Sequence, residues 1–173
     1  MVYANRQNEP GSRASFGKRK SAGKILISMN ISFRQINNDD FEFLWHLHNS
    51  ALKEYVAQTW GWDENWQRKS FEKQFNSAEG EIITVNEIDA GFLRVIKKET
   101  EILLASIRLL PEFQNRGIGT TIIKNLLNTS QKSVRLQVLK VNPARVLYKR
   151  LGFEIADETE THFKMIKISA EES

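Results

Sequence analysis

The chain has 173 residues, enough for one domain with a sizeable hydrophobic core. It contains no cysteine, which excludes disulfides, thiolate nucleophiles and cysteine-based zinc sites and favours a reducing compartment, the cytoplasm. The three histidines, His46, His48 and His162, are too scattered to predict a metal site, and no apolar run approaches the roughly 18 residues of a membrane span.

The formal net charge of +4 is concentrated at the N-terminus. Residues 1–28 carry six basic side chains and one acidic side chain, a net +5, so the other 145 residues have a net charge of −1. The segment has no apolar period, so we expect residues 1–28 to be a disordered extension and residues 29–173 to be a single domain. Three roles are open for this segment: a nucleic-acid-binding tail, a targeting peptide, or an extension ahead of a natural start at Met29. The nearly neutral domain itself is not expected to bind nucleic acid.

The domain is predicted to begin with a strand and two helices. Residues 31–36 alternate as a strand, and Asp39 with Glu42 resembles a capping box at a helix start. Apolar residues from 41 to 56 recur at helical spacing, which predicts a long amphipathic helix. The Thr-Trp-Gly-Trp sequence at 59–62 interrupts this helix, and a second helix is predicted over 63–75.

Three strands follow in the prediction, over residues 81–88, 92–96 and 101–110. Their connections are short, with a turn expected at residues 89–91 and another at 97–100. Short connections between successive strands favour an antiparallel meander.

A glycine-containing loop, residues 109–120 (LLPEFQNRGIGT), joins the last of these strands to a helix. Gly117 and Gly119 open that helix, whose first N–H groups have no intrahelical partner and whose dipole attracts anions. Glycine lets a phosphate approach the backbone, Arg116 adds a cation, and Thr120 adds a hydroxyl donor. The spacing matches neither a Walker loop nor the dinucleotide fingerprint. An ordinary glycine turn is the alternative to a phosphate site.

The remaining elements are a strand over 134–139, a short helix, and strands over 153–156 and 162–168. A strand, a helix and a strand in succession predict a right-handed parallel crossover, with the loop at the carboxyl ends of the two strands. Asn142 and Pro143 are typical of a helix start, and Gly152 of a helix end. The predicted fold class is therefore α/β with a mixed sheet.

Two motifs resemble those of the GNAT superfamily, the acyl-CoA-dependent N-acetyltransferases. The first is Gln-x-x-Gly-x-Gly, residues 114–119, between a strand and a helix. The second is residues 141–153 (VNPARVLYKRLGF), in which an Asn precedes a short helix with Leu-Tyr and a closing Gly-Phe. The predicted order of strand, two helices, three strands, helix, strand, helix and two strands is also similar to the order in this family.

The resemblance implies acetyl-CoA as acyl donor and an amine as acceptor. It implies that the strand before the loop contacts the pantetheine arm, that the loop binds the pyrophosphate, and that the Asn lies near the arm. It further implies that Tyr148 is the general acid that protonates the departing thiolate. Many members separate the Asn and Tyr by one residue more, so a plain helix cap is an equal alternative for Asn142. The implied cofactor-binding residues are Ile107, Arg108, Leu109, Gln114, Asn115, Arg116, Gly117, Ile118, Gly119, Thr120 and Asn142.

The acceptor side is implied to lie between the first two helices and the last two strands. Trp60, Trp62, Asp63 and Glu64 cluster there, and aromatic faces with carboxylates suit a cationic amine. Packing between the helices is the alternative role of the tryptophans. We expect no metal and assign no general base. A homodimer is left open, and a non-catalytic acyl-CoA-binding module is the alternative to an enzyme.

Overall fold

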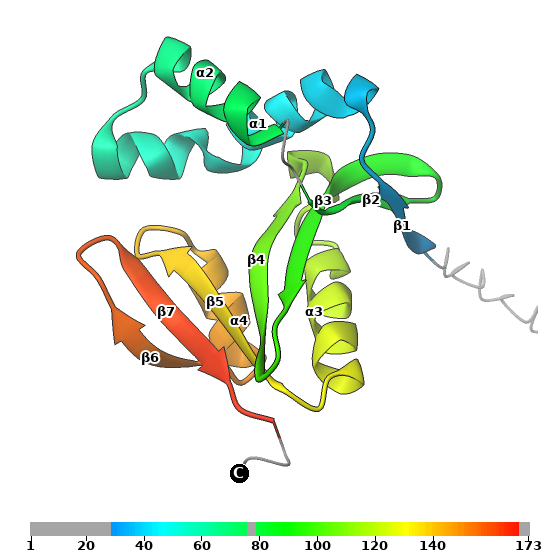
Figure 1. Ribbon diagram of the computed structural model, residues 1–173, viewed down its shortest axis with the longest axis vertical. Helices are drawn as coiled ribbons and strands as arrows, with labels where there is room; N and C mark the ends of the chain where they lie inside the picture. The colour runs from blue at the N-terminus through cyan, green and yellow to red at the C-terminus, as the bar shows by residue number, and fades with distance from the viewer. Residues whose placement is uncertain (1–28, 76–78, 170–173) are drawn as a thin grey trace, which may run out of the picture.

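The computed structural model describes residues 29–75 and 79–169. The segment expected to be a disordered extension, residues 1–28, lies outside the described residues. Seven strands form one sheet in the order β1-β2-β3-β4-β5-β7-β6 (Figure 1). In chain order the elements are β1 (Ile31–Gln35), η1 (Asn38–Asp40), α1 (Phe41–Trp60), α2 (Glu64–Phe75), β2 (Glu81–Val85), β3 (Ile88–Lys97), β4 (Glu101–Leu109), η2 (Pro111–Phe113), α3 (Ile118–Thr129), β5 (Ser133–Leu139), α4 (Ala144–Arg150), β6 (Glu154–Glu158) and β7 (His162–Lys167).

The helices cover both faces of the sheet. Helices α3 and α4 pack on one face, where Ile118, Ile123 and Tyr148 join the larger hydrophobic core with strand residues such as Leu104. Helices α1 and α2 cover the other face, where Leu47 packs in a second core with residues of β2 and β3. Side chains of successive strand residues point to opposite faces, so β2 and β3 contribute to both cores. No described helix is long and apolar enough to cross a membrane.

The strand order and the mixed sheet confirm the predicted fold class. Strands β1 to β4 are antiparallel neighbours, and β4 pairs with β5 in parallel across the α3 crossover. Strand β7 then lies between β5 and β6, antiparallel to both. The predicted parallel crossover therefore places the glycine-containing loop at the carboxyl end of β4, in the middle of the sheet.

The predicted turn at residues 89–91 is wrong. The chain reverses at Asn86 and Glu87, which both adopt a positive φ, at 50° and 69°, as a two-residue hairpin requires. Gly91 instead lies inside β3, opposite Leu109. A Cβ atom at Gly91 would collide with the carbonyl of Arg108, so this glycine is required for close strand approach rather than for a turn.

The predicted capping box and helix break also differ from the structure. The capping box is formed by Asn37 and Asp40 at the start of η1, and not by Asp39 and Glu42. Helix α1 continues through the predicted break to Trp60 and ends at Gly61, whose φ of 82° only glycine adopts readily. The tryptophan-rich segment therefore begins on α1 itself.

Asp40 is a buried acid held by a charged cluster. Its carboxylate accepts hydrogen bonds from Nη1 of Arg34 at 2.9 Å and Nη2 at 2.7 Å, and a further bond from the Asn37 N–H at 2.8 Å. Arg34 also donates from Nε to Asp89 at 2.9 Å. This cluster fixes the entry of the chain into α1 against β1 and β3.

We expect Asp40→Asn to lower the free energy of unfolding by about 2 kcal/mol, because it removes charge-assisted hydrogen bonds from a buried position. Denaturant unfolding at neutral pH measures this loss. Asp157→Asn is the matched control, since Asp157 pairs with Lys164 at the surface and its loss should cost less than about 1 kcal/mol.

The effect of Asp40→Asn should depend on pH. Hydrogen bonds from Arg34 hold the pKa of Asp40 below its usual range, against the opposing effect of burial. A carboxylate with a lowered folded-state pKa stabilises the fold above its unfolded pKa of about 3.9, and this contribution is lost as pH falls through the folded value. The stability difference between wild type and variant should therefore shrink on acidification. An equal difference at all pH values would contradict this role.

Candidate active site

Strands β4 and β5 part from each other in the middle of the sheet. They pair over four residue pairs, the last of which joins Leu104 to Leu136. Beyond this point Ile107–Leu109 pair with β3 only. The Leu110 N–H donates to the Ala90 carbonyl at 2.9 Å, so the alternation of the strand turns the N–H groups of Leu109 and Ile107 toward the side of β5. These donors face the opening between the two strands.

The glycine-containing loop has a backbone suited to an anion. Asn115 and Gly117 are both left-handed, with φ of 57° and 81°, and Gly117 is the residue before α3. The first helical hydrogen bond runs from the Thr121 N–H to the Gly117 carbonyl at 2.9 Å. The N–H groups just before Thr121 therefore have no intrahelical acceptor and remain available to a ligand.

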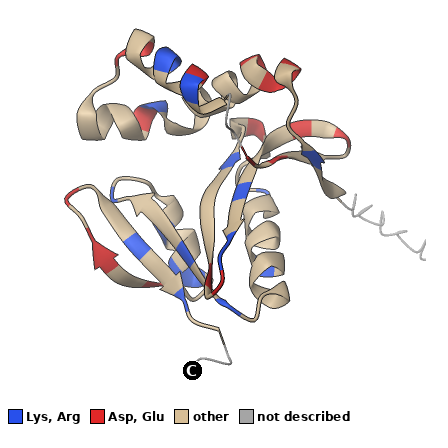
Figure 2. Ribbon diagram, viewed as in Figure 1, with Lys and Arg blue, Asp and Glu red and all other residues tan. Residues whose placement is uncertain are grey.

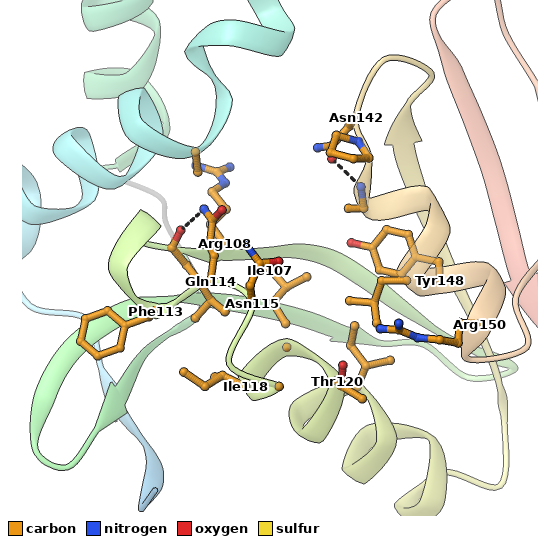
Figure 3. Close-up of a pocket in the computed structure, with 18 of the residues that line it drawn as sticks. Ile107, Arg108, Phe113, Gln114, Asn115, Ile118, Thr120, Asn142, Tyr148 and Arg150 are labelled. Carbon is orange, nitrogen blue, oxygen red and sulfur yellow. Dashed lines mark hydrogen bonds between the residues drawn. The ribbon is translucent and has the colours of Figure 1, made fainter.

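Side chains tie this loop to β4. The Gln114 side chain donates from Nε2 to the Leu109 carbonyl at 2.9 Å, so it holds the loop against the strand end (Figure 3). Arg116, predicted as the mobile cation, places its guanidinium 5.9 Å from the ring centre of Phe113 and does not line the cavity described below.

Helix α4 brings the second motif to the same opening. The Asn142 side chain accepts a hydrogen bond from the Ala144 N–H at 2.9 Å, which is the cap that the sequence predicts. The helix ends as predicted at Gly152, with φ of 85°, while the Phe153 N–H donates to the Tyr148 carbonyl at 3.0 Å. Both ends of this short helix are thus fixed by hydrogen bonds.

Tyr148 lies on α4 with its hydroxyl directed into the opening (Figure 3). Its ring is buried and packs edge-on against Phe153, with 5.9 Å between ring centres. The hydroxyl makes no hydrogen bond to any other residue of the described part of the chain. Burial raises the pKa of Tyr148 to about 12, so the hydroxyl stays protonated at physiological pH.

A cavity of about 530 Å³ joins these parts. It runs from the loop, past the end of β4, to α4 (Figure 3). The structure thus brings together all but one of the predicted cofactor-binding and catalytic residues. Those that line the cavity are Ile107, Arg108, Leu109, Gln114, Asn115, Gly117, Ile118, Gly119, Thr120, Asn142 and Tyr148.

The cavity also contains residues that sequence reasoning missed. Arg150 lines it from α4 and supplies a cation near the loop, and Ala51, Leu52 and Tyr55 line it from α1. The sequence shows Arg150 two residues after Tyr148, but nothing in that spacing says that both side chains face one cavity. The wall from α1 depends on how α1 crosses the sheet, which the sequence pattern does not specify.

The tryptophan cluster predicted for the acceptor lies at the turn between α1 and α2. Trp60, Trp62, Asp63 and Trp66 line a separate hollow of about 430 Å³. Trp60 also reaches β7, where its ring centre is 5.8 Å from that of His162. Helix α1 and the last hairpin therefore meet at this point.

Glu64 does not line that hollow. Its carboxylate accepts from Nε1 of Trp62 at 2.7 Å and from Nζ of Lys53 at 3.1 Å. The bond from Trp62, followed by that from Lys53, lowers the pKa of Glu64. A carboxylate with two donors and a lowered pKa is a weak base, so Glu64 is best explained as a support for the turn.

His48 is a partly buried histidine beside the cavity. Its ring stacks on Trp45 at 5.7 Å, and its Nδ1 lies 3.3 Å from Nη1 of Arg108. Burial first, and then the charge of Arg108, lower the pKa of His48 to about 4. His48 is therefore neutral at physiological pH and can accept a hydrogen bond from Arg108, which positions that arginine.

The described part of the chain offers no strong base and no metal site at the opening. Glu101 is engaged at the far end of β4 with Lys98 and Arg135, at 2.7 Å each. No carboxylate lines the 530 Å³ cavity among the described residues. Within the same residues, no cluster of three or more His, Cys, Asp or Glu side chains could hold a metal ion.

Comparisons with known proteins agree with this fold. Residues 75–155 match the family model described as an acetyltransferase (GNAT) domain. An N-acetyltransferase of Methanocaldococcus jannaschii is 27% identical over 149 residues, which are 79% of this chain and 66% of that relative. The chain therefore spans about two thirds of the length of this relative.

Solved structures share the fold. The PaiA N-acetyltransferase from Thermoplasma acidophilum, solved in complex with coenzyme A, has a TM-score of 0.61 at 19% identity, covering 81% of this chain and 99% of its own. A ribosomal-protein alanine N-acetyltransferase from Escherichia coli has a TM-score of 0.57 at 21% identity, with 81% and 94% covered.

The mixed α/β fold of the described residues, with its seven-stranded sheet and four helices, matches the fold of these acetyltransferase structures. The family match over residues 75–155, the curated relative and the solved folds together support the GNAT superfamily of acetyltransferases for this chain. The predicted family is thus confirmed, and with it acetyl-CoA as the acyl donor of the class.

Proposed function

We propose that this protein transfers an acetyl group from acetyl-CoA to a primary amine, and that the domain spanning residues 29–173 does so by direct attack of the amine. The observation that carries the proposal is the single 530 Å³ cavity, which unites the loop, the unpaired end of β4 and Tyr148. A phosphate site, a strand edge and an acid in one cavity match the three parts of an acyl-CoA thioester.

The loop end of the cavity would hold the pyrophosphate. The free N–H groups at the start of α3 and the left-handed residues Asn115 and Gly117 supply donors, and the helix dipole adds positive potential. Arg150 lines the cavity there, whereas Arg116 stacks on Phe113. We therefore assign the phosphate-neutralising charge to Arg150 in place of Arg116.

The β4 end would hold the arm and the reacting carbonyl. The N–H groups of Ile107 and Leu109 face the opening, so they can pair with the amides of an extended arm as a neighbouring strand would. The Leu109 N–H is the donor we assign to the oxyanion that forms when an amine attacks a thioester, since a donor already in place stabilises developing charge. Tyr148 would donate its proton, or a hydrogen bond, to the departing thiolate.

The amine acceptor would enter from the side of α1, α2 and the β6–β7 hairpin. The exposed tryptophans with Asp63 suit a cationic amine before it loses its proton. Acidic positions are prominent on β6 and the turn that follows it (Figure 2). Because no described carboxylate lines the reaction cavity, we propose that water carries the amine proton to solvent.

Thiol release from acetyl-CoA in the presence of a panel of primary amines tests this function. We expect thiol release that depends on an amine and yields the matching acetamide, identified by mass spectrometry. Calorimetry with coenzyme A is run in parallel. Coenzyme A binding without turnover of any amine would instead support a non-catalytic acyl-CoA-binding module, which the lack of a carboxylate in the cavity also allows.

A further inference from the structure

A second cavity lies beside the reaction cavity, between the α1–α2 layer and strands β3 and β4. Its volume is about 270 Å³, and three of its ten lining residues are aromatic, Phe71, Phe75 and Phe92. Arg94 and Arg108 also line it. Lys and Arg positions are visible on β3 and β4 beneath the two helices (Figure 2). The lining is thus mixed, with aromatic side chains, two arginines and the carboxylate of Glu79.

The two arginines lie on the same face of the sheet because of strand register. Phe92 pairs with Arg108, and Arg94 pairs with Ser106, so alternation directs all four side chains toward α1 and α2. The Arg108 guanidinium lies 5.9 Å from the ring centre of Phe92. Arg108 lines the reaction cavity as well, and is therefore the side chain that the two cavities share.

Among the described residues that line this cavity, Arg94 has an acidic neighbour and Arg108 has none. No carboxylate of a described residue lies within ion-pair distance of Arg108, whose hydrogen-bond partner is the neutral His48. Arg94 has an Nε atom that is buried without a partner in the described structure, and its Nη2 lies 3.9 Å from Oε2 of Glu79. The Glu79 side chain also lines the cavity, but it is 84% exposed, so solvent screens its ion pair with Arg94.

An enclosed guanidinium without a counter-ion is unfavourable unless a ligand supplies the charge. Burial alone lowers the pKa of Arg108 to about 10, which reflects the same cost. A carboxylate accepts two parallel hydrogen bonds from an arginine, so it matches both the charge and the donors of this site. The three phenylalanines in the lining suit an apolar chain next to that carboxylate.

We propose that the acceptor is an amine that also bears a carboxylate, which Arg108 and Arg94 bind in the 270 Å³ cavity while the amine reaches the reaction cavity. This inference rests on the proposed function and narrows its acceptor class to amino-acid-like molecules. Arg108 directly precedes Leu109 in the sequence. The residue proposed to bind the carboxylate is therefore next to the residue whose N–H is assigned to the oxyanion.

The test is a set of acceptor pairs that differ only in their acid group. Leucine, phenylalanine and 6-aminohexanoate are each compared with their amides, so that several spacings between amine and carboxylate are sampled. The amino group of an amino acid has a different pKa from that of its amide, so the two compounds differ in intrinsic reactivity. We therefore compare, for each compound, the kcat/KM of the wild type divided by that of the variant. The intrinsic reactivity of the compound cancels in this ratio.

We expect Arg94→Gln to lower kcat/KM for the preferred acid by about tenfold or more, the scale of a lost charge-assisted contact, and to change that of its amide less than about twofold. Arg108→Gln should likewise lower kcat/KM more for the acid than for its amide. Lys97→Gln is the matched control, because it removes a cation from the exposed end of β3 outside the cavity. Unchanged melting temperatures and coenzyme A affinity establish that Arg94→Gln is folded.

Equal losses for acid and amide, or the same loss in Lys97→Gln, would overturn the inference while leaving the proposed function intact. Failure to acetylate any amine would instead refute the proposed function. The cavity is then judged by calorimetry with 3-phenylpropionate and 3-phenylpropanamide. Tighter binding of the acid that is lost in Arg94→Gln would support the anion site, and equal binding of the two would overturn it.

Discussion

Tyr148→Phe is expected to reduce kcat by about 100-fold, the usual scale of general-acid assistance, with little change in coenzyme A affinity. The variant keeps the buried ring and its edge contact with Phe153, so the fold and the cavity shape should persist. It removes only the hydroxyl that points into the cavity. Steady-state kinetics with the true acceptor, together with calorimetry for coenzyme A, measure the two quantities.

The raised pKa of Tyr148 defines how this hydroxyl can help. With a tyrosine at about 12 and a thiol near 8.5, complete proton transfer to the thiolate is uphill by about 5 kcal/mol. A hydrogen bond that stabilises the thiolate while solvent delivers the proton avoids most of this cost. Since the hydroxyl is protonated below its pKa, the pH profile of kcat should show no alkaline limb from Tyr148 in the ordinary assay range.

Tyr55→Phe is the comparison variant, because Tyr55 is the other tyrosine that lines the cavity. If Tyr55→Phe loses activity and Tyr148→Phe retains it, Tyr148 is a packing residue and the acid lies on α1. If both variants turn over as the wild type does, solvent alone protonates the thiolate.

Gly119→Val should weaken coenzyme A binding by about 30-fold or more, equivalent to about 2 kcal/mol. A Cβ at Gly119 would have only Leu147 and Leu109 as neighbours, at 3.9 and 4.0 Å, so the fold accepts it. The branched side chain would then project into the cavity at the start of α3, where the pyrophosphate is expected. Calorimetry gives the affinity, and thermal unfolding verifies the fold.

Thr121→Val controls for placing valine in the first turn of α3, because Thr121 is exposed and does not line the cavity. This variant should bind coenzyme A as tightly as the wild type. Undiminished affinity in Gly119→Val would remove the loop from the cofactor site, whatever the activity of the variant.

The sequence patterns predicted the central part of the fold well, because those signals are local. The glycine-containing loop, the cap at Asn142 and the helix end at Gly152 each depend on residues next to one another in the chain. The turn at 89–91 was predicted wrongly because a glycine two residues after an aspartate is typical of a turn. The need for Gly91 arises from the carbonyl of Arg108, a contact that only the paired strands reveal.

The candidate site shows the same limit. Tyr148 and the loop follow from their motifs, whereas the roles assigned to Arg150 and Arg94 depend on which cavity each side chain faces. His48 could be identified from the sequence only as a titratable residue on an apolar helix face. Its low pKa results from burial and from Arg108, and Arg108 lies 60 residues away.

The parting of β4 and β5 gives the sheet an internal edge in addition to the outer edges at β1 and β6. Exposed edges recruit foreign strands, and so they promote aggregation. This edge is short, and Pro111 follows it closely with no N–H to extend a ladder. Ala51, Leu52 and Leu147 wall it from α1 and α4. The narrow arm of acetyl-CoA can reach this edge between the two helices. A strand of another protein would collide with α1 and α4, so the opening does not favour aggregation.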